Sequence, residues 1–290
     1  MKKILIVGAG VVGEATGKGL ATAHEVVFVD INPFTIEHLR EQTFTAVQPN
    51  EMTLTDVHLV IVTVPTPCTD EHGIDTSHLE AASYSIGHAL RASTTLGTYP
   101  VIVYRSTVTP GTTRDLLIPL LEKTSGLIAH QDFGVCYNPE YLRAHSALAD
   151  FVSPRLVTIG SYKPYDRAYQ MLEKIYIEAL GDIPIEEGTY EEAEFHKLVH
   201  NAFNATKISF FNEMRSLAKH ISIDPERAFI LTAKTAEGLW NPNYGIRDFG
   251  AYRGACLPKD VNSLLWHAQQ HGIKLPILTA VQAVNRALGE

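Results

Sequence analysis

The chain has 290 residues, of which 45% are hydrophobic and 19% charged, a composition typical of an ordinary soluble protein with room for two domains. Its 24 basic and 32 acidic side chains give a net charge of −8, which argues against a nucleic-acid-binding surface. No apolar run is as long as a membrane span, and the apolar run after Lys3 is too short for a signal peptide. Cys68, Cys136 and Cys256 are odd in number and far apart, so we expect no disulfide framework and a reducing, cytoplasmic location.

A glycine-rich turn follows the first apolar strand, which we expect at residues 4–7. The first glycine permits a tight turn, the second lets the backbone approach a diphosphate, and the third lets the following helix pack closely on the strand. The residues of this turn expected to contact a dinucleotide are Gly8, Gly10, Val11, Val12 and Gly13.

A second apolar strand, at residues 25–29, ends in Asp30. A carboxylate at this position would accept hydrogen bonds from ribose hydroxyls and repel a 2′-phosphate, so we expect the cofactor to be NAD rather than NADP. The alternative is a glycine-rich turn in another kind of α/β protein, in which Asp30 only caps the next helix. The order of strand, turn, helix, strand and acid favours the dinucleotide site.

The alternation of strands and helices continues and predicts a doubly wound, Rossmann-type parallel sheet of about six strands. Further strands are expected at residues 57–64, 100–104, 133–137 and 156–160, and helices at 77–91, 113–123 and 165–180. Val64, Pro65 and Thr66 follow one strand at the carboxyl edge, where open α/β sheets bind ligands. The hydroxyl-rich loop at 105–112 follows the next strand, and its default role is to cap a helix.

The strand pattern stops at about Tyr190, and residues 191–220 form one helical pattern without glycine or proline. So long a helix must leave the first domain and carry the second. We therefore expect an NAD-binding domain at residues 1–188 and an all-helical domain at 189–290, with this long central helix as the seam of a homodimer.

Four polar residues on this helix have suggestive spacings. Lys197 and Asn201 are four apart and share a face, for which an ordinary exposed surface is the default. His196 and His200 have a spacing that suits a metal ion, but no third ligand is evident and we expect no metal.

The rest of the helical domain predicts shorter helices around one loop. A helix begins at residues 224–226, where aspartate precedes proline. Residues 237–254 are rich in glycine, asparagine, tyrosine and arginine and predict a loop able to cover a ligand. The last two helices are expected at 261–270 and from about Pro276.

The segment from Gly254 to Asp260 places the thiol of Cys256 close to the cation of Lys259 and the carboxylate of Asp260. Nearby cations favour the reactive thiolate, and a carboxylate can move a proton. The alternative is a buried structural cysteine ahead of a helix that begins near Pro258.

Seven segments, in order along nearly the whole chain, resemble the UDP-glucose/GDP-mannose dehydrogenase family. They are the Gly8–Asp30 fingerprint, Val64-Pro65-Thr66-Pro67, Ser106 to Thr112, Asn138-Pro139-Glu140-Tyr141-Leu142, Glu194 to Phe203, Asn212-Glu213 and Gly254 to Asp260. The resemblance implies an NAD-dependent, four-electron oxidation of a nucleotide sugar's primary alcohol to a carboxylate, with UDP-glucose as the expected substrate.

By this resemblance, Cys256 is the nucleophile that captures the aldehyde formed by the first hydride transfer. Lys197 and Asn201 would stabilise the oxyanion, Asp260 and Glu140 would move protons, and Thr107 would position the hydrolytic water. The resemblance also implies cofactor contacts from Val64, Pro65, Thr66, Ser106, Thr107 and Lys259, and substrate contacts from Glu140, Tyr141, Leu142, Lys197, Asn201, Tyr252 and Gly254.

The sequence departs from the family's pattern at three positions: Ala144 replaces a second glutamate, Arg253 a glycine, and Trp240 an upstream arginine. It also stops at Glu290, about where the family's central helices end, so we expect either a truncated enzyme or a short protein without the third domain. These departures leave two alternatives open. One is a two-electron alcohol dehydrogenase for a smaller substrate, and the other is an NAD-binding remnant without catalysis.

Overall fold

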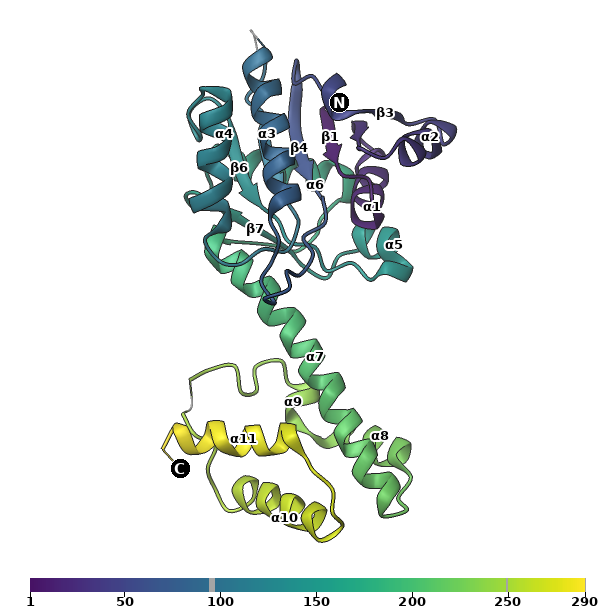
Figure 1. Cartoon of the computed structure of the whole chain (residues 1–290), viewed down its shortest axis with the longest axis vertical. Helices are drawn as coiled ribbons and strands as arrows, with labels where there is room; N and C mark the ends of the chain where they lie inside the picture. Colours follow the sequence, from purple (N-terminus) through teal and green to yellow (C-terminus); the bar gives the residue numbers. More distant parts are fainter. Residues whose placement is uncertain (94–96, 249, 290) are drawn as a thin grey trace. The chain divides into compact units, whose positions relative to one another are not determined.

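The computed structural model describes residues 1–93, 97–248 and 250–289, and the chain forms two compact units, Met1–Val199 and His200–Glu290 (Figure 1). The first unit contains a sheet and the helices around it, and the second contains helices. One helix, α7, belongs to both, because it spans Tyr190–His220. Within the described residues, no helix is both long and apolar enough to cross a membrane.

The first unit is built on an eight-stranded sheet with the order β3-β2-β1-β4-β5-β6-β7-β8. Its strands are β1 (Lys3–Val7), β2 (Glu25–Val29), β3 (Thr45–Val47), β4 (Val57–Val62), β5 (Val101–Tyr104), β6 (Gly134–Tyr137), β7 (Val157–Ser161) and β8 (Ile185–Thr189). The doubly wound α/β fold is confirmed, and all neighbours pair in parallel except β6 and β7, which are antiparallel.

The estimate of about six strands was wrong because it missed β3 and β8. These are the two edge strands of the sheet. β3 has three residues and β8 reads Ile-Glu-Glu-Gly-Thr, so neither has the continuous apolar run that marks a central parallel strand.

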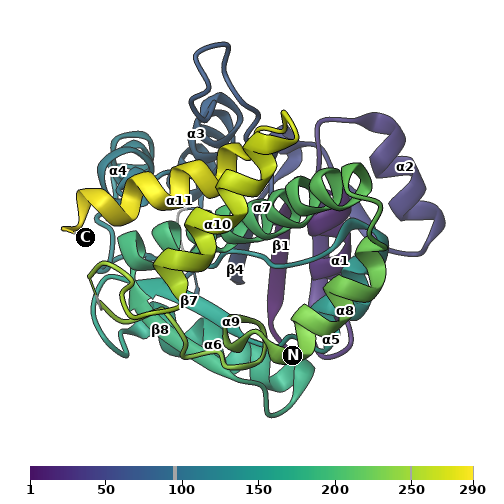
Figure 2. The same cartoon turned by 90° about the horizontal axis from the view of Figure 1, so that it is seen from below.

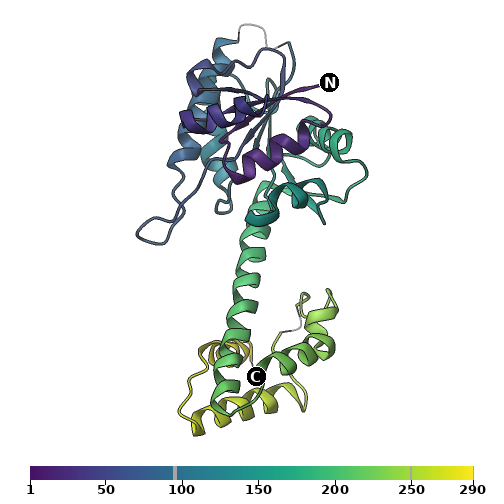
Figure 3. The same ribbon diagram turned by 90° about the vertical axis from the view of Figure 1, so that its right-hand side faces the viewer.

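Helices cover both faces of the sheet (Figures 1 and 3). The first unit contains α1 (Val11–Leu20), α2 (Pro33–Glu41), α3 (Ser77–Ala92), α4 (Ile118–Ser125), α5 (Ala147–Val152) and α6 (Arg167–Leu180), with single turns at Pro49–Glu51, Thr113–Leu117 and Ala144–Ser146. Ile4 and Ile6 of β1 belong to the core under α1, α2 and α6, whereas Leu5 and Val7 belong to the core under α3 and α4. The central strands β1, β4 and β5 are mostly apolar because both of their faces are buried.

The second unit contains the end of α7 together with α8 (Pro225–Thr235), α9 (Glu237–Trp240), α10 (Leu257–Gln270) and α11 (Pro276–Ala287). α10 and α11 pack against each other (Figure 2). A small core forms around Leu217, Ala268, Leu275 and Leu278. Glu213 of α7 accepts hydrogen bonds from the backbone N–H groups of Ile277 and Leu278 at 2.8 and 3.2 Å, which satisfies the free donors at the start of α11.

The long helix is confirmed, but two expectations for the second unit were wrong. Residues 237–254 are not all loop, because α9 occupies their first turn. α10 begins at Leu257, so the expected start at residue 261 was wrong and the other expected start, near Pro258, is confirmed. Proline is tolerated in the first turn of a helix. Cys256 is therefore the residue that precedes α10.

Candidate functional site

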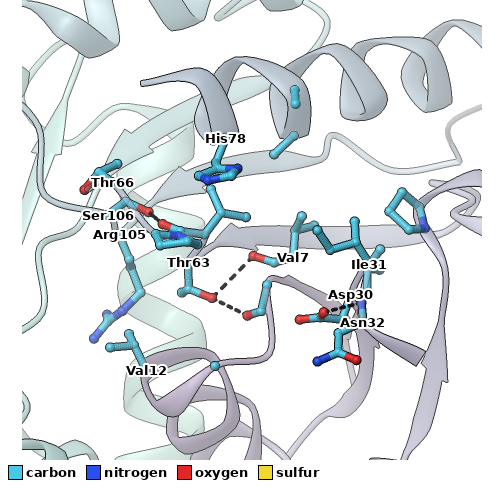
Figure 4. A pocket seen from close by; sticks show the side chains of 18 of the residues that line it. Val7, Val12, Asp30, Ile31, Asn32, Thr63, Thr66, His78, Arg105 and Ser106 are labelled. Carbon is cyan, nitrogen blue, oxygen red and sulfur yellow. Dashed lines mark hydrogen bonds between the residues drawn. The ribbon is translucent and has the colours of Figure 1, made fainter. Parts of the chain in front are cut away.

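A cavity of about 640 Å³ opens at the carboxyl ends of the central strands of the first unit (Figure 4). We call it the strand-end cavity. Among the residues that line it are Gly8, Gly10, Val11, Val12, Asp30, Val64, Pro65, Thr66, Ser106, Thr107 and Glu140. The structure thus brings together most of the residues expected to bind the cofactor, although they come from four separate stretches of the sequence. Gly13 is not among the described residues that line the cavity, and Lys259 belongs to the second unit.

The three glycines of the turn differ in what surrounds them. A Cβ on Gly13 would lie 2.0 Å from the carbonyl oxygen of Gly8, so only glycine lets α1 pack this closely on the turn. Gly8 has a φ of +89°, and its hypothetical Cβ would lie 3.0 Å from the backbone nitrogen of Val64. A Cβ on Gly10 would meet no atom of the described residues within 4 Å. The space in front of the first turn of α1 is therefore open, which fits a diphosphate at the helix N-terminus.

The carboxylate of Asp30 is held in place by the backbone. Its Oδ2 accepts a hydrogen bond from the N–H of Ala9 at 2.7 Å, and its Oδ1 accepts one from the N–H of Asn32 at 2.8 Å. Asp30 thus ties the end of β2 to the glycine turn, while it still lines the cavity. Oxygens of a carboxylate can accept further bonds, so this arrangement fits a ribose.

The loops after β4 and β5 are hydrogen-bonded to each other at the cavity wall. The hydroxyl of Ser106 donates to the carbonyl of Val64 at 2.5 Å, and the hydroxyl of Thr66 donates to the carbonyl of Thr107 at 2.8 Å. These bonds connect two of the predicted cofactor-binding segments and give the hydroxyl groups a role beyond helix capping.

Lys197 and Glu140 form an ion pair beside the cavity. The Nζ atom of Lys197 lies 3.0 Å from Oε1 of Glu140 and donates to the backbone oxygen of the same residue, while Oε2 of Glu140 accepts from the N–H of Leu142 at 2.6 Å. Lys197 is only 4% exposed, so the default interpretation of a surface lysine was wrong. A buried lysine of this kind needs the carboxylate, because an unpaired buried cation is costly.

Glu194 lies one helical turn before Lys197 and is completely buried. Its two carboxylate oxygens accept hydrogen bonds from the N–H groups of Gly111 and Thr113 at 2.6 and 2.8 Å. Burial raises the pKa of Glu194 above its ordinary value. Thus a single turn of α7 holds the loop after β5 through Glu194 and the loop after β6 through Lys197.

Two residues predicted to bind the substrate lie away from the cavity wall. The hydroxyl of Tyr141 donates to Oγ1 of Thr158 at 3.1 Å and lies 3.1 Å from Nδ1 of His196. Leu142 packs against the core under α1 and α6.

His200, one of the two histidines with a spacing that suits a metal ion, lies 3.1 Å from the side-chain nitrogen of Asn204. Among the described residues, no cluster of three histidine, cysteine or acidic side chains could hold a metal ion.

The remaining predicted catalytic residues belong to the second unit. Asn201 and Cys256 are exposed, and Lys259 and Asp260 form an exposed ion pair of 3.1 Å in the first turn of α10. The interpretation of Cys256 as a buried structural cysteine was therefore wrong. That description fits Cys136, which is fully buried, and burial raises the pKa of its thiol.

A second cavity, of about 940 Å³, lies within the second unit between α11 and the loop after α9. It is lined in part by Tyr252, Arg253 and Leu257. The backbone N–H and carbonyl of Tyr252 both bond to the side chain of Asn285, at 2.6 and 3.1 Å, and Asn285 is 2% exposed. Gly254 has a φ of +93°, which favours glycine at the bend before the cysteine.

Sequence reasoning missed several residues that line the first cavity, among them Asn32, Met52, His78 and Arg105. Arg105 could have been found because it directly follows β5 at the carboxyl edge, and Asn32 because it lies in the short loop after β2. Met52 and His78 come from a turn and a helix that only the folded chain brings to the wall, so no local pattern marks them.

Comparison with known proteins gives a consistent result. Residues 2–180 match the NAD binding domain of the UDP-glucose/GDP-mannose dehydrogenase family, and residues 191–287 match the central domain of that family. The chain is 31% identical to the GDP-mannose 6-dehydrogenase of Pseudomonas aeruginosa, over 98% of this chain and 68% of that protein. It is 29% identical to a UDP-glucose 6-dehydrogenase of Haloferax volcanii, over 98% of this chain and 69% of that protein.

A solved structure agrees with these matches. The crystal structure of a ternary complex of GDP-mannose dehydrogenase from Pseudomonas aeruginosa superposes with a TM-score of 0.89, at 30% identity, and the match covers 99% of this chain and 69% of that one.

Proposed function

Because the chain belongs to the UDP-glucose/GDP-mannose dehydrogenase family, we propose that it catalyses the four-electron, NAD-dependent oxidation of a nucleotide sugar's primary alcohol to a carboxylate. It is an NAD-dependent oxidoreductase of this family. The observation that carries the proposal is Glu140, which lines the cavity that fits NAD and also pairs with the buried Lys197. This pair supports the proposal because it supplies a cation and a proton acceptor next to the cavity that fits NAD.

The proposed reaction proceeds through a covalent bond to Cys256. NAD, when bound, supplies the hydride acceptor, and a second molecule of NAD would have to replace the first NADH before the second oxidation. The first step removes a hydride and a proton from the alcohol and leaves an aldehyde. The thiolate of Cys256 then adds to the aldehyde carbon to form a thiohemiacetal, which loses the second hydride and becomes a thioester. Water cleaves the thioester, which releases the carboxylate and regenerates the thiol.

The other polar residues are proposed to stabilise charge and to move protons. Lys197 and Asn201 supply a cation and an amide donor to the oxyanion that develops on the thiohemiacetal. Glu140 and Asp260 accept the protons released by the alcohol and by water. Thr107 orients that water. Among the described residues no side chain binds the hydroxyl of Thr107, which supports this role.

The identity of the nucleotide sugar is a separate proposal. UDP-glucose is the expectation from the sequence resemblance. GDP-mannose is a second candidate substrate. The chain is 31% identical to a GDP-mannose 6-dehydrogenase and 29% identical to a UDP-glucose 6-dehydrogenase, and the crystal structure of a GDP-mannose dehydrogenase superposes closely. Both substrates contain a hexose with a primary alcohol, so the same chemistry serves either one.

The number of NADH molecules formed per molecule of sugar nucleotide consumed tests this proposal. We expect two NADH per UDP-glucose or per GDP-mannose, with a carboxylate as the product. One NADH per sugar, with an aldehyde as the product, would favour the two-electron reaction that Ala144 suggests. No turnover with either sugar, while NAD still binds, would contradict both proposed substrates.

We also propose that two chains pair through α7, as the sequence pattern predicts. Large apolar side chains on this helix are exposed, including Phe195 at 61%, Phe203 at 60% and Ile208 at 64%. Apolar side chains so exposed along one helix suit a protein interface. Sedimentation should show a species of twice the 32.0 kDa chain mass, and a purely monomeric profile at micromolar concentration would contradict this proposal.

A further inference from the structure

Arg105 is a buried cation whose charge no described side chain balances. It directly follows β5 and is 4% exposed. Its Nη1 atom donates to the side-chain oxygen of Asn138 and to the hydroxyl of Tyr176, the latter at 2.6 Å, and both partners are neutral. Its Nε atom is buried and has no hydrogen-bond partner among the described residues. Within that part of the chain, no carboxylate comes within 4 Å of its guanidinium.

A buried cation without a counter-ion lowers the stability of the folded protein. A buried ion without a counter-ion loses its hydration and gains no compensating attraction. The contrast with Lys197 is direct, because that lysine is equally buried but pairs with Glu140 at 3.0 Å. The ring of Phe151, whose centroid lies 5.7 Å from the guanidinium carbon of Arg105, supplies only a weaker cation–π contact. The fold therefore leaves an unbalanced positive charge that an anionic ligand could neutralise.

The place of Arg105 identifies the chemistry of that ligand. Arg105 lines the strand-end cavity and is its single lysine or arginine among the described lining residues, whereas Asp30 and Glu140 are acidic. In Figure 4 its side chain extends toward Val12, in the first turn of α1. The N-terminus of such a helix is where a dinucleotide places its diphosphate, which is the anionic part of NAD.

We propose that Arg105 is a cofactor-binding residue, and that its charge is neutralised by the diphosphate of NAD. The glycine turn then provides the close approach and the backbone donors, while Arg105 provides the full positive charge. This inference rests on the binding of NAD and is independent of which sugar is oxidised.

The proposal predicts a large effect on ligand binding and a small effect on stability. Replacement of Arg105 by methionine removes the charge but keeps a long side chain, and Asn138 keeps its hydrogen bond from Tyr176 at 2.6 Å. Affinity for a ligand with a diphosphate should fall by at least about tenfold, because a charge-assisted bond is lost. The melting temperature of the ligand-free protein should fall by less than about 4 °C or should rise, because an uncompensated buried charge is gone.

The experiment compares ADP-ribose, which carries the diphosphate without nicotinamide, with adenosine, which carries no phosphate. Binding of each is measured by calorimetry or NMR to the wild-type chain, to Arg105→Met and Arg105→Lys, and to the control Arg91→Met at an exposed arginine of α3. We expect Arg105→Met to lose affinity for ADP-ribose but to bind adenosine within about twofold of the wild type. Arg105→Lys should recover most of the loss, and Arg91→Met should change neither affinity.

Two results would overturn the proposal. If Arg105→Met binds ADP-ribose like the wild type, the charge has no role in binding. If Arg105→Met no longer folds, or loses affinity for ADP-ribose and adenosine equally, Arg105 belongs to the scaffold. Failure of the wild type itself to bind ADP-ribose would instead overturn the assignment of the strand-end cavity to NAD.

Discussion

Replacement of Cys256 by serine is expected to lower kcat by roughly a thousandfold or more, because the reaction then lacks its nucleophile. A serine hydroxyl is a much weaker nucleophile than a thiolate at neutral pH, so the aldehyde is not captured. Affinity for NAD should stay within about twofold of the wild type, because Cys256 belongs to the helical unit and the strand-end cavity to the other. Steady-state kinetics and calorimetry measure the two effects separately.

The matched control for this substitution is Cys68→Ser. Cys68 is also exposed, but it lies in the loop after β4. This variant should keep wild-type turnover and still form two NADH per sugar. A Cys256→Ser enzyme that does the same would eliminate the covalent mechanism, and the proposed reaction would then need another way to hold the aldehyde.

Replacement of Lys197 by methionine should lower kcat by about a hundredfold to a thousandfold, the range seen when one donor to an oxyanion is lost. The substitution also leaves the carboxylate of Glu140 without its cation, although the N–H of Leu142 still donates to it at 2.6 Å. Lys207→Met, at an exposed position of the same helix, controls for the loss of a positive charge on α7.

A double substitution separates the two roles that Lys197 could have. If Lys197 acts only by holding Glu140, Lys197→Met should cause no further loss in an enzyme that already carries Glu140→Gln. If Lys197 also stabilises the oxyanion, Lys197→Met should lower kcat further even in the Glu140→Gln enzyme. Equal activity of the double variant and of Glu140→Gln would thus limit Lys197 to positioning.

The fold could be predicted from the sequence where burial leaves a local pattern. The central strands are mostly apolar because both of their faces are covered, and α7 contains neither glycine nor proline. β3 and β8 were not predicted, because edge strands are partly exposed to solvent and lack a continuous apolar run. The start of α10 was expected both near Pro258 and at residue 261, because proline marks a helix boundary without fixing the first helical residue.

The site was predictable where its residues form contiguous motifs and unpredictable where they meet only in space. Gly8, Gly10 and Asp30 were found because the turn and the following strand are local. The burial of Lys197 was missed because its partner, Glu140, is 57 residues away in the sequence. Arg105 was overlooked because a cation in a loop is usually solvated. Its place directly after β5 points to the cavity wall, but no local pattern shows that its side chain is buried.

In the turn of α7 that contains Glu194 and Lys197, the site depends on the relative directions in which these two side chains leave the helix. Each residue of an α-helix advances the side-chain direction by about 100°, so residues three apart point within roughly 60° of each other. Glu194 and Lys197 can therefore reach adjacent loops from one side of the helix. A residue inserted between them would rotate one by about 100° relative to the other, and only one of the two loops could then keep its anchor. The number of residues between Glu194 and Lys197 is thus as tightly constrained as the identity of these two charged residues.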